Sequence, residues 1–184
     1  KRRLDEILAT GIKVAANQLH YNLVSRAIED EIMPACQAHG VGILGYMTIL
    51  QGILAGKYKT LDEIPAPRRR TRHFRGDSTP LSRHGEAGAE TELQAALDQI
   101  RVIADEVQMP MEQLAIRWAF ANPALTCALV GARNVAQIEA IAAAGAESLP
   151  TAVVARLNTV TQPLKEKLGP SLDYYEHTSL DRTL

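Results

Sequence analysis

Three short segments of the sequence carry side chains suited to holding a flat, charged ligand. Gln18 and Tyr46 lie at the ends of two apolar runs, and Gly131-Ala132-Arg133 follows a third. A Gln amide both donates and accepts hydrogen bonds, as a carboxamide requires, and a Tyr ring offers a flat face to another ring. Gly allows close backbone approach, and the Arg fork suits a phosphate. Together the three segments indicate a nucleotide site.

Other reactive residue types give weaker signals. No His pairs with Cys, Asp or Glu at the spacing of metal ligands on one helix, so we expect no structural zinc. His73 and His84 flank an arginine-rich stretch and could be functional, although a solvated loop is the simpler interpretation. Cys36 and Cys127 each lie in an apolar stretch, which is typical of buried thiols in a reducing cytoplasm.

A dinucleotide-binding motif, G-x-G-x-x-G, occurs at residues 40–45. This motif functions when it follows a strand and opens a helix, because the N-terminal end of the helix then meets the pyrophosphate. Here it follows a predicted helix and lies within a predicted strand. We therefore do not interpret it as a Rossmann-type site.

The elements that must position these residues alternate between strand and helix. Apolar runs at 14–19, 41–46 and 125–130 are typical of buried parallel strands. Helical patterns occur at 3–9, 28–38, 89–107, 110–121, 135–144 and 150–167. The alternation predicts an α/β fold with parallel strands. In a parallel barrel, functional groups collect at the carboxyl ends of strands, which is where the three ligand-holding segments lie.

Two segments have no regular pattern. Residues 59–90 contain prolines, glycines and a cluster of arginines, and loops of this length are usually functional or mobile. The cluster could bind a phosphate. Residues 168–184 are predicted to form a polar C-terminal tail.

Composition narrows the class of protein. The 184 residues, 46% hydrophobic and 22% charged, fit one globular unit with a real core. A net charge of -1 provides no general attraction for nucleic acid or an anionic membrane. No apolar run approaches the roughly 20 residues that span a bilayer. We expect no nucleic-acid or membrane partner and a cytoplasmic location. Because the chain opens inside a helical pattern, we also expect it to belong to a longer protein.

The ordered segments resemble the aldo-keto reductase superfamily over nearly the whole chain. The resemblance rests on residues 17–23 with Arg26 and 34–36, on residues 46–58, and on residues 130–134 with Gln137. These resemble the sixth strand and its helix, the family's "YSPLxxGxLxGKY" segment, and its "VGAR" turn after strand eight. Residues 72–74 and 83–86 are similar to one bacterial branch of the family. The implied fold for residues 1–184 is the C-terminal part of a TIM (β/α)8 barrel. It would have about three parallel strands with helices, and the N-terminal barrel strands would be absent.

The resemblance implies NADP(H) as the cofactor. Gln18 would hydrogen-bond the nicotinamide carboxamide, and Tyr46 would stack on the nicotinamide ring. The pyrophosphate would be held by the backbone of Met47, Thr48 and Ile49, by Lys57 and, as a strap, by Arg69. The adenosine 2′-phosphate, which distinguishes NADP(H) from NAD(H), would be surrounded by Gly131, Arg133 and Gln137.

The sequence departs from the family pattern at four positions. Met47-Thr48 replaces the usual Ser-Pro, and Ala140 and Ile141 replace an acidic residue and an Asn that normally contact the adenosine. Each lost polar contact is worth about 0.5–1.5 kcal/mol. The resemblance therefore implies weaker cofactor binding than in a typical member.

The family's catalytic set is not found in this sequence. The resemblance places its Tyr, Lys, Asp and His on the first four strands, and adjacent His20 and Tyr21 point to opposite faces of one strand. We expect the NADP(H)-binding part of an oxidoreductase whose full-length parent reduces a small-molecule carbonyl, without catalysis by this chain alone. The alternatives are a non-catalytic nucleotide-binding or regulatory module, as in the potassium-channel β-subunits that resemble this family, and a fragment without function.

Three strands from a barrel would leave open edges and an apolar face. Ala15, Leu19, Ile43 and Leu129 would face water, and the irregular loop and tail are too polar to cover them well. Open edges and exposed apolar patches mark interfaces. We expect the chain to self-associate or to pair with a chain that supplies the missing strands.

Overall fold

The computed structural model describes residues 1–183 and contains one small parallel sheet. Its strands lie in chain order: β1 (Ala16–His20), β2 (Gly42–Tyr46) and β3 (Cys127–Ala128). The predicted parallel α/β arrangement is confirmed. The third strand is shorter than the predicted 125–130, although the N–H groups of Thr126 and Leu129 still donate to carbonyls of β2.

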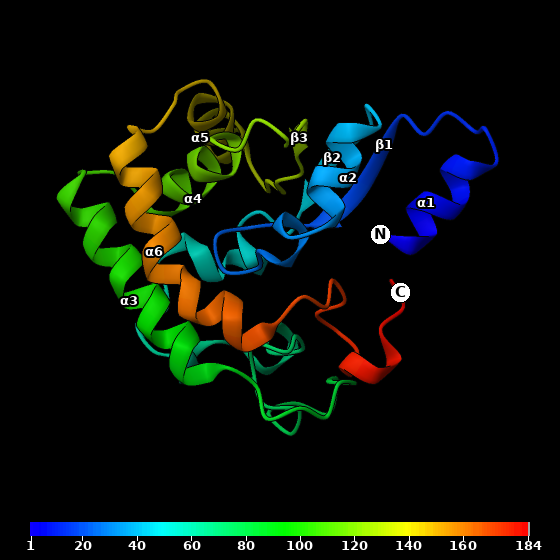
Figure 1. Ribbon diagram of the computed structural model, residues 1–184. Helices are drawn as coiled ribbons and strands as arrows, with labels where there is room; N and C mark the ends of the chain where they lie inside the picture. The colour runs from blue at the N-terminus through cyan, green and yellow to red at the C-terminus, as the bar shows by residue number, and fades with distance from the viewer. Residues whose placement is uncertain (184) are drawn as a thin grey trace.

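Six α-helices surround the sheet within the described residues (Figure 1). They are α1 (Arg2–Ala9), α2 (Ile32–Ala38), α3 (Glu90–Glu106), α4 (Met111–Phe120), α5 (Val135–Gly145) and α6 (Thr151–Leu168). Single-turn 3₁₀ helices cover Ala27–Glu29, Leu61–Glu63, Ala66–Arg68 and Thr178–Leu180, and a longer one covers Leu50–Ala55. The predicted helix 28–38 is divided, because Pro34 excludes a helical hydrogen bond back to residue 30 and α2 therefore starts at Ile32.

α2 and α4 pack directly against the sheet, α5 packs on α4, and α6 packs on α3. Figure 1 shows α6 running alongside α3, while α1 stands at the edge of the molecule. The predicted cap of α5 is confirmed, since the Asn134 side chain accepts a hydrogen bond from the Gln137 N–H. Ile43 is fully buried in this core. The expectation that Leu19 and Ile43 would face water is wrong, because both side chains pack on the helix-covered face.

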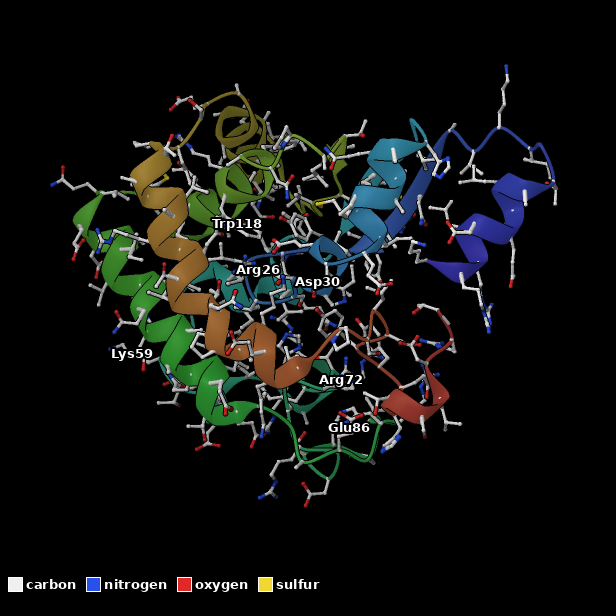
Figure 2. All side chains as sticks on the ribbon, viewed as in Figure 1. Arg26, Asp30, Lys59, Arg72, Glu86 and Trp118 are labelled. Atoms are coloured by element: carbon white, nitrogen blue, oxygen red, sulfur yellow. The ribbon has the colours of Figure 1, made fainter. Side chains whose placement is uncertain are left out.

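The long irregular segment is part of the core rather than a solvated loop. Between Gly56 and Ala89 the structure has no α-helix or β-strand, as predicted. Nevertheless His73 and His84 are almost completely buried, so the solvated interpretation of these histidines is wrong. Arg72 is buried too, and it donates to three backbone carbonyls of the tail and approaches Glu86 (Figure 2).

The tail after α6 folds back over the molecule. Tyr174 is buried, and its hydroxyl accepts a hydrogen bond from the Ala27 N–H. Arg182 forms an ion pair with buried Asp173 at 2.6 Å. The tail therefore covers the carboxyl ends of the strands, which the sequence did not predict. Within residues 1–183, no helix has the length and apolar character needed to cross a membrane.

Candidate functional site

The carboxyl ends of β1 and β2 present three side chains on the face of the sheet opposite the helices. His20 and Tyr46 are register partners, and their ring centroids are 5.1 Å apart. Gln18 lies two residues before His20 and so shares its face. Gln18 is exposed and Tyr46 half-buried. Burial raises the pKa of Tyr46, which keeps the ring neutral and suited to stacking.

The loop after β2 has an unusual backbone. Met47, Leu50 and Gln51 have φ angles of 60°, 41° and 53°, and Gly52 follows at 86°. Left-handed conformations are strained for residues with a Cβ, and they gather at functional sites. The N–H groups of Leu50 and Gly52 close turns within the loop, because they donate to the carbonyls of Met47 and Ile49 at 2.7 and 2.8 Å. The loop lies directly beyond Tyr46, where the family resemblance implies that the pyrophosphate would lie.

Two cations converge on Gly52 in this loop. A methyl group placed on its Cα would lie 3.4 Å from Lys57 Nζ and 3.6 Å from Arg68 Nη1. Arg68 also donates to the Tyr58 hydroxyl at 2.6 Å. In the described part of the chain, neither cation pairs with a carboxylate. An anion at this loop would therefore meet two available positive charges.

The neighbouring arginines leave further donors available. The Nε groups of Arg69 and Arg70 are buried and have no hydrogen-bond partner among residues 1–183. Buried donors in native proteins usually have a partner, so these two Nε groups would suit an anionic ligand. Arg69 as a strap stays a prediction. Arg68 was not among the predicted site residues, because an irregular run of arginines does not indicate which side chain reaches the loop.

The third predicted segment follows β3 and is exposed. The Arg133 N–H donates to Gln137 Oε1 at 2.8 Å, so both residues belong to one ordered turn before α5. A Cβ added to Gly131 would meet nothing within 4 Å, which leaves open space for a ligand. The turn is tied to β2 through the Leu129 N–H, which donates to the Gly45 carbonyl at 2.7 Å.

Two predicted backbone positions need separate comment. The Thr48 hydroxyl is buried and lies 3.4 Å from the carbonyls of Gly45 and Leu129. This hydroxyl therefore braces the loop and does not replace the Ser of the family pattern. Ile49 precedes the Leu50–Ala55 turn, and only its backbone is predicted to contact the ligand.

Tyr21 lies apart from this site. Its hydroxyl is 3.0 Å from Glu29 Oε1 and accepts a hydrogen bond from Asn122 at 3.1 Å, on the helix side of the sheet. Burial raises the pKa of this hydroxyl far above its usual value. The expected separation of His20 and Tyr21 onto opposite faces is confirmed.

The chain was compared with known proteins. A model of the Aldo/keto reductase family matches residues 2–162. A probable voltage-gated potassium channel subunit beta from Arabidopsis thaliana is 28% identical, covering 66% of this chain and 35% of that protein. The L-glyceraldehyde 3-phosphate reductase of Escherichia coli (strain K12) is 28% identical, covering 70% and 36%. The chain thus spans little more than a third of these curated relatives.

A solved structure shares the fold. The glycerol dehydrogenase from Gluconobacter oxydans superposes with a TM-score of 0.66 at 21% sequence identity. The match covers 86% of this chain and 46% of that one. The arrangement of three parallel strands and their helices therefore corresponds to part of a larger known architecture.

Proposed function

The chain belongs to the aldo/keto reductase family, and from this we propose that it is the NADP(H)-binding part of an oxidoreductase. The observation that carries the proposal is the strained loop after Tyr46, on which Lys57 and Arg68 converge at Gly52. A pyrophosphate carries negative charge, which would pair with the positive charges of these two side chains. The proposed fold of the parent is a (β/α)8 barrel, with this chain as its C-terminal part.

The described residues fit such a cofactor. Gln18 would hold the carboxamide of a nicotinamide ring stacked on Tyr46, and the loop beyond Tyr46 would hold the pyrophosphate. Arg133, with the open space at Gly131, would hold the adenosine 2′-phosphate. When bound, NADP(H) supplies or accepts the hydride that interconverts a carbonyl and an alcohol.

We propose that this chain alone does not complete the reaction. Tyr46 would be occupied as a stacking surface, and the Tyr21 hydroxyl is engaged with Glu29 and Asn122 behind the sheet. A missing general acid costs roughly 10²–10⁴-fold in rate. The parent's substrate would be a small carbonyl compound, bound by loops outside this chain.

A non-catalytic nucleotide-binding or regulatory module is the second candidate. The Arabidopsis thaliana relative and a Schizosaccharomyces pombe relative, 30% identical over 131 residues, are both described as potassium channel β-subunits. The internal use of the Thr48 hydroxyl also removes one polar contact from the cofactor loop. This candidate shares the nucleotide site and differs only in the chemistry of the whole protein.

Titration calorimetry tests the nucleotide site. We expect NADP⁺ to bind more tightly than NAD⁺, and Arg133→Ala to abolish the difference at a cost of about 1.5–3 kcal/mol. Lys57→Met should weaken both nucleotides equally, because it acts on the shared pyrophosphate. Lys59→Met is the matched control, since exposed Lys59 (Figure 2) should not affect either affinity.

Equal wild-type affinities for NADP⁺ and NAD⁺ would contradict the assignment of Arg133. The same preparation, freed of host reductases, should not oxidise NADPH in the presence of 4-nitrobenzaldehyde. Turnover that survives Tyr46→Phe would show that a general acid exists elsewhere in the chain.

A further inference from the structure

His20 has a buried ring nitrogen without a partner. The residue is 3% exposed, and its Nδ1 has no hydrogen-bond partner anywhere in residues 1–183. The ring lies beside Tyr46 at the carboxyl end of β1, on the face that also carries Gln18. A buried polar atom without a partner at this place requires an explanation.

The hydrogen bonds of Asn22 determine which nitrogen of His20 carries the proton. Asn22 Oδ1 accepts from the Val24 N–H at 3.0 Å, and Nδ2 donates to the Met47 carbonyl at 3.0 Å. Two backbone groups therefore fix the orientation of the amide. The atom that faces His20 Nε2, at 3.2 Å, is consequently the Nδ2 donor. Nε2 must accept, so in the neutral ring the proton resides on Nδ1.

The imidazole is neutral throughout the physiological range. Burial is the main cause that lowers its pKa to about 3, and the neighbouring His73 lowers it further, outweighing the opposite effect of Asp173. The free group is therefore an uncharged N–H donor. Its surroundings are the rings of Tyr46, Tyr174 and Tyr175, with centroids 5.1, 4.7 and 6.3 Å away. Such a dry, aromatic setting suits a neutral acceptor better than a phosphate.

We propose that the Nδ1–H group of His20 is a positioning donor for the carboxamide oxygen of a nicotinamide stacked on Tyr46. The inference rests on the proposed function. Gln18 and His20 are two residues apart on one strand face, a spacing of roughly 6.6 Å. A carboxamide with a hydrogen bond at each end can span this gap, with its NH₂ donating to Gln18 and its oxygen accepting from His20.

The ligand must displace part of the tail to reach this donor. Tyr174 is buried and bonded to the Ala27 N–H, whereas Tyr175 is only half-buried. In this proposal a ligand would displace Tyr175, the less buried of the two rings, and leave Tyr174 beside the imidazole.

Two substitutions separate the donor from the internal hydrogen bond. His20→Gln places an oxygen near the Nε2 position, where it accepts from Asn22, and removes the Nδ1 donor. His20→Asn places an N–H near the Nδ1 position and removes the bond to Asn22. The probes are NADP⁺ and 2′,5′-ADP, which lacks the nicotinamide, measured by calorimetry after a thermal melt has shown that each variant folds.

We expect His20→Gln to weaken NADP⁺ about three- to tenfold, as the loss of one neutral hydrogen bond does, and 2′,5′-ADP less than about twofold. His20→Asn should retain NADP⁺ affinity within about threefold. Unchanged NADP⁺ binding by His20→Gln, or equal weakening of both probes, would overturn the inference and leave the proposed function intact. If the wild type binds neither probe, both fail.

A measurement on the wild type decides the matter if the variants do not fold. The ¹⁵N resonance of His20 Nδ1 should shift when NADP⁺ is added and stay in place with 2′,5′-ADP. A resonance that responds equally to both probes would contradict the inference.

Discussion

Two buried imidazoles illustrate how single residues govern this molecule. His20 lies beneath the tail, and His73 bridges distant segments, with Nε2 2.8 Å from the Val24 carbonyl and Nδ1 3.0 Å from the Thr71 hydroxyl. Burial is the main cause that lowers the pKa of His73 to about 4. Both rings are therefore neutral in the folded protein at pH values where an unfolded chain would protonate them.

The folded protein should lose stability as the pH falls below 6.5. The unfolded state takes up protons near the ordinary pKa of 6.5, whereas the folded state does so only near 3 and 4. The contribution of the two neutral rings to the free energy of unfolding is therefore fully present above pH 6.5. Toward pH 4, each ring lowers the free energy of unfolding by about 1.4 kcal/mol per pH unit. Urea unfolding between pH 7 and 5 measures this slope. Because the buried carboxyls of Asp173 and Asp181 have lowered pKa values, they contribute only below this window.

A free energy of unfolding that stays constant from pH 7 to 5 would contradict this prediction. Burial also lowers the pKa of His84, so this ring adds to the slope. His39, which is exposed, provides the control: His39→Gln should leave the slope unchanged, whereas His73→Gln should lower it by the share of one ring.

At the scale of elements, the long irregular segment and the tail are held together by Arg72. Its guanidinium donates to the carbonyls of Leu168, Ser171 and Asp173 at 2.9–3.1 Å and lies 5.5 Å from the Tyr174 ring centroid. The buried side chain thus positions the part of the tail that covers His20.

Replacing Arg72 should loosen the tail. We expect Arg72→Met to destabilise the protein by about 3 kcal/mol, because several charge-assisted hydrogen bonds are lost and buried carbonyls are left without donors. Hydrogen exchange should accelerate over residues 168–175. Arg75→Met is the matched control, because Arg75 is exposed and its ion pair with Asp77 contributes little. Unchanged exchange in the tail of Arg72→Met would refute this role.

The sequence predicted the regular elements but not the packing of the irregular ones. Apolar periodicity located the helices and the first two strands to within a few residues, because those elements depend on local spacing. Arg72, His73 and His84 are buried in a segment without periodicity, and only the folded chain brings their partners close.

The candidate site was predictable to a similar extent. Gln18 and Tyr46 follow from their places at strand ends, which fix the face on which they lie. The convergence of Lys57 with Arg68 depends on the path of an irregular loop. The unpartnered nitrogen of His20 depends on the orientation of Asn22, which no spacing in the sequence indicates.

At the scale of the whole molecule, the sheet and α5 present surfaces that suit association. β1 and β3 form the outer edges of the sheet, and unpaired strand edges invite further strands. Beside β3, Leu129, Val135 and Ile138 are 41%, 69% and 49% exposed. Ala15 is exposed, as expected for a residue at the open edge of the sheet. The tail lies at the carboxyl ends of the strands, where Tyr174 contacts His20.

We propose that the chain self-associates, or pairs with a chain that supplies further strands, through this surface. Sedimentation velocity at micromolar concentration should show species larger than the monomer, because apolar patches of this kind are seldom left in water. Ile138→Lys should shift the distribution toward the monomer, whereas Leu81→Lys, an equally exposed position in the irregular segment, should not. A sharply melting monomer that binds no hydrophobic dye would oppose the proposal.

The strained loop after Tyr46 also has a consequence for laboratory evolution. Leu50 is buried in the core, so glycine there would cost more than it relieves. At Met47 and Gln51, glycine adopts positive φ without penalty and would relieve about 1 kcal/mol at each position. Selection of a random library for heat resistance alone should therefore enrich glycine at these positions. Selection for retention on a nucleotide resin should remove it again, because a relaxed loop samples many shapes and must be ordered at each binding event.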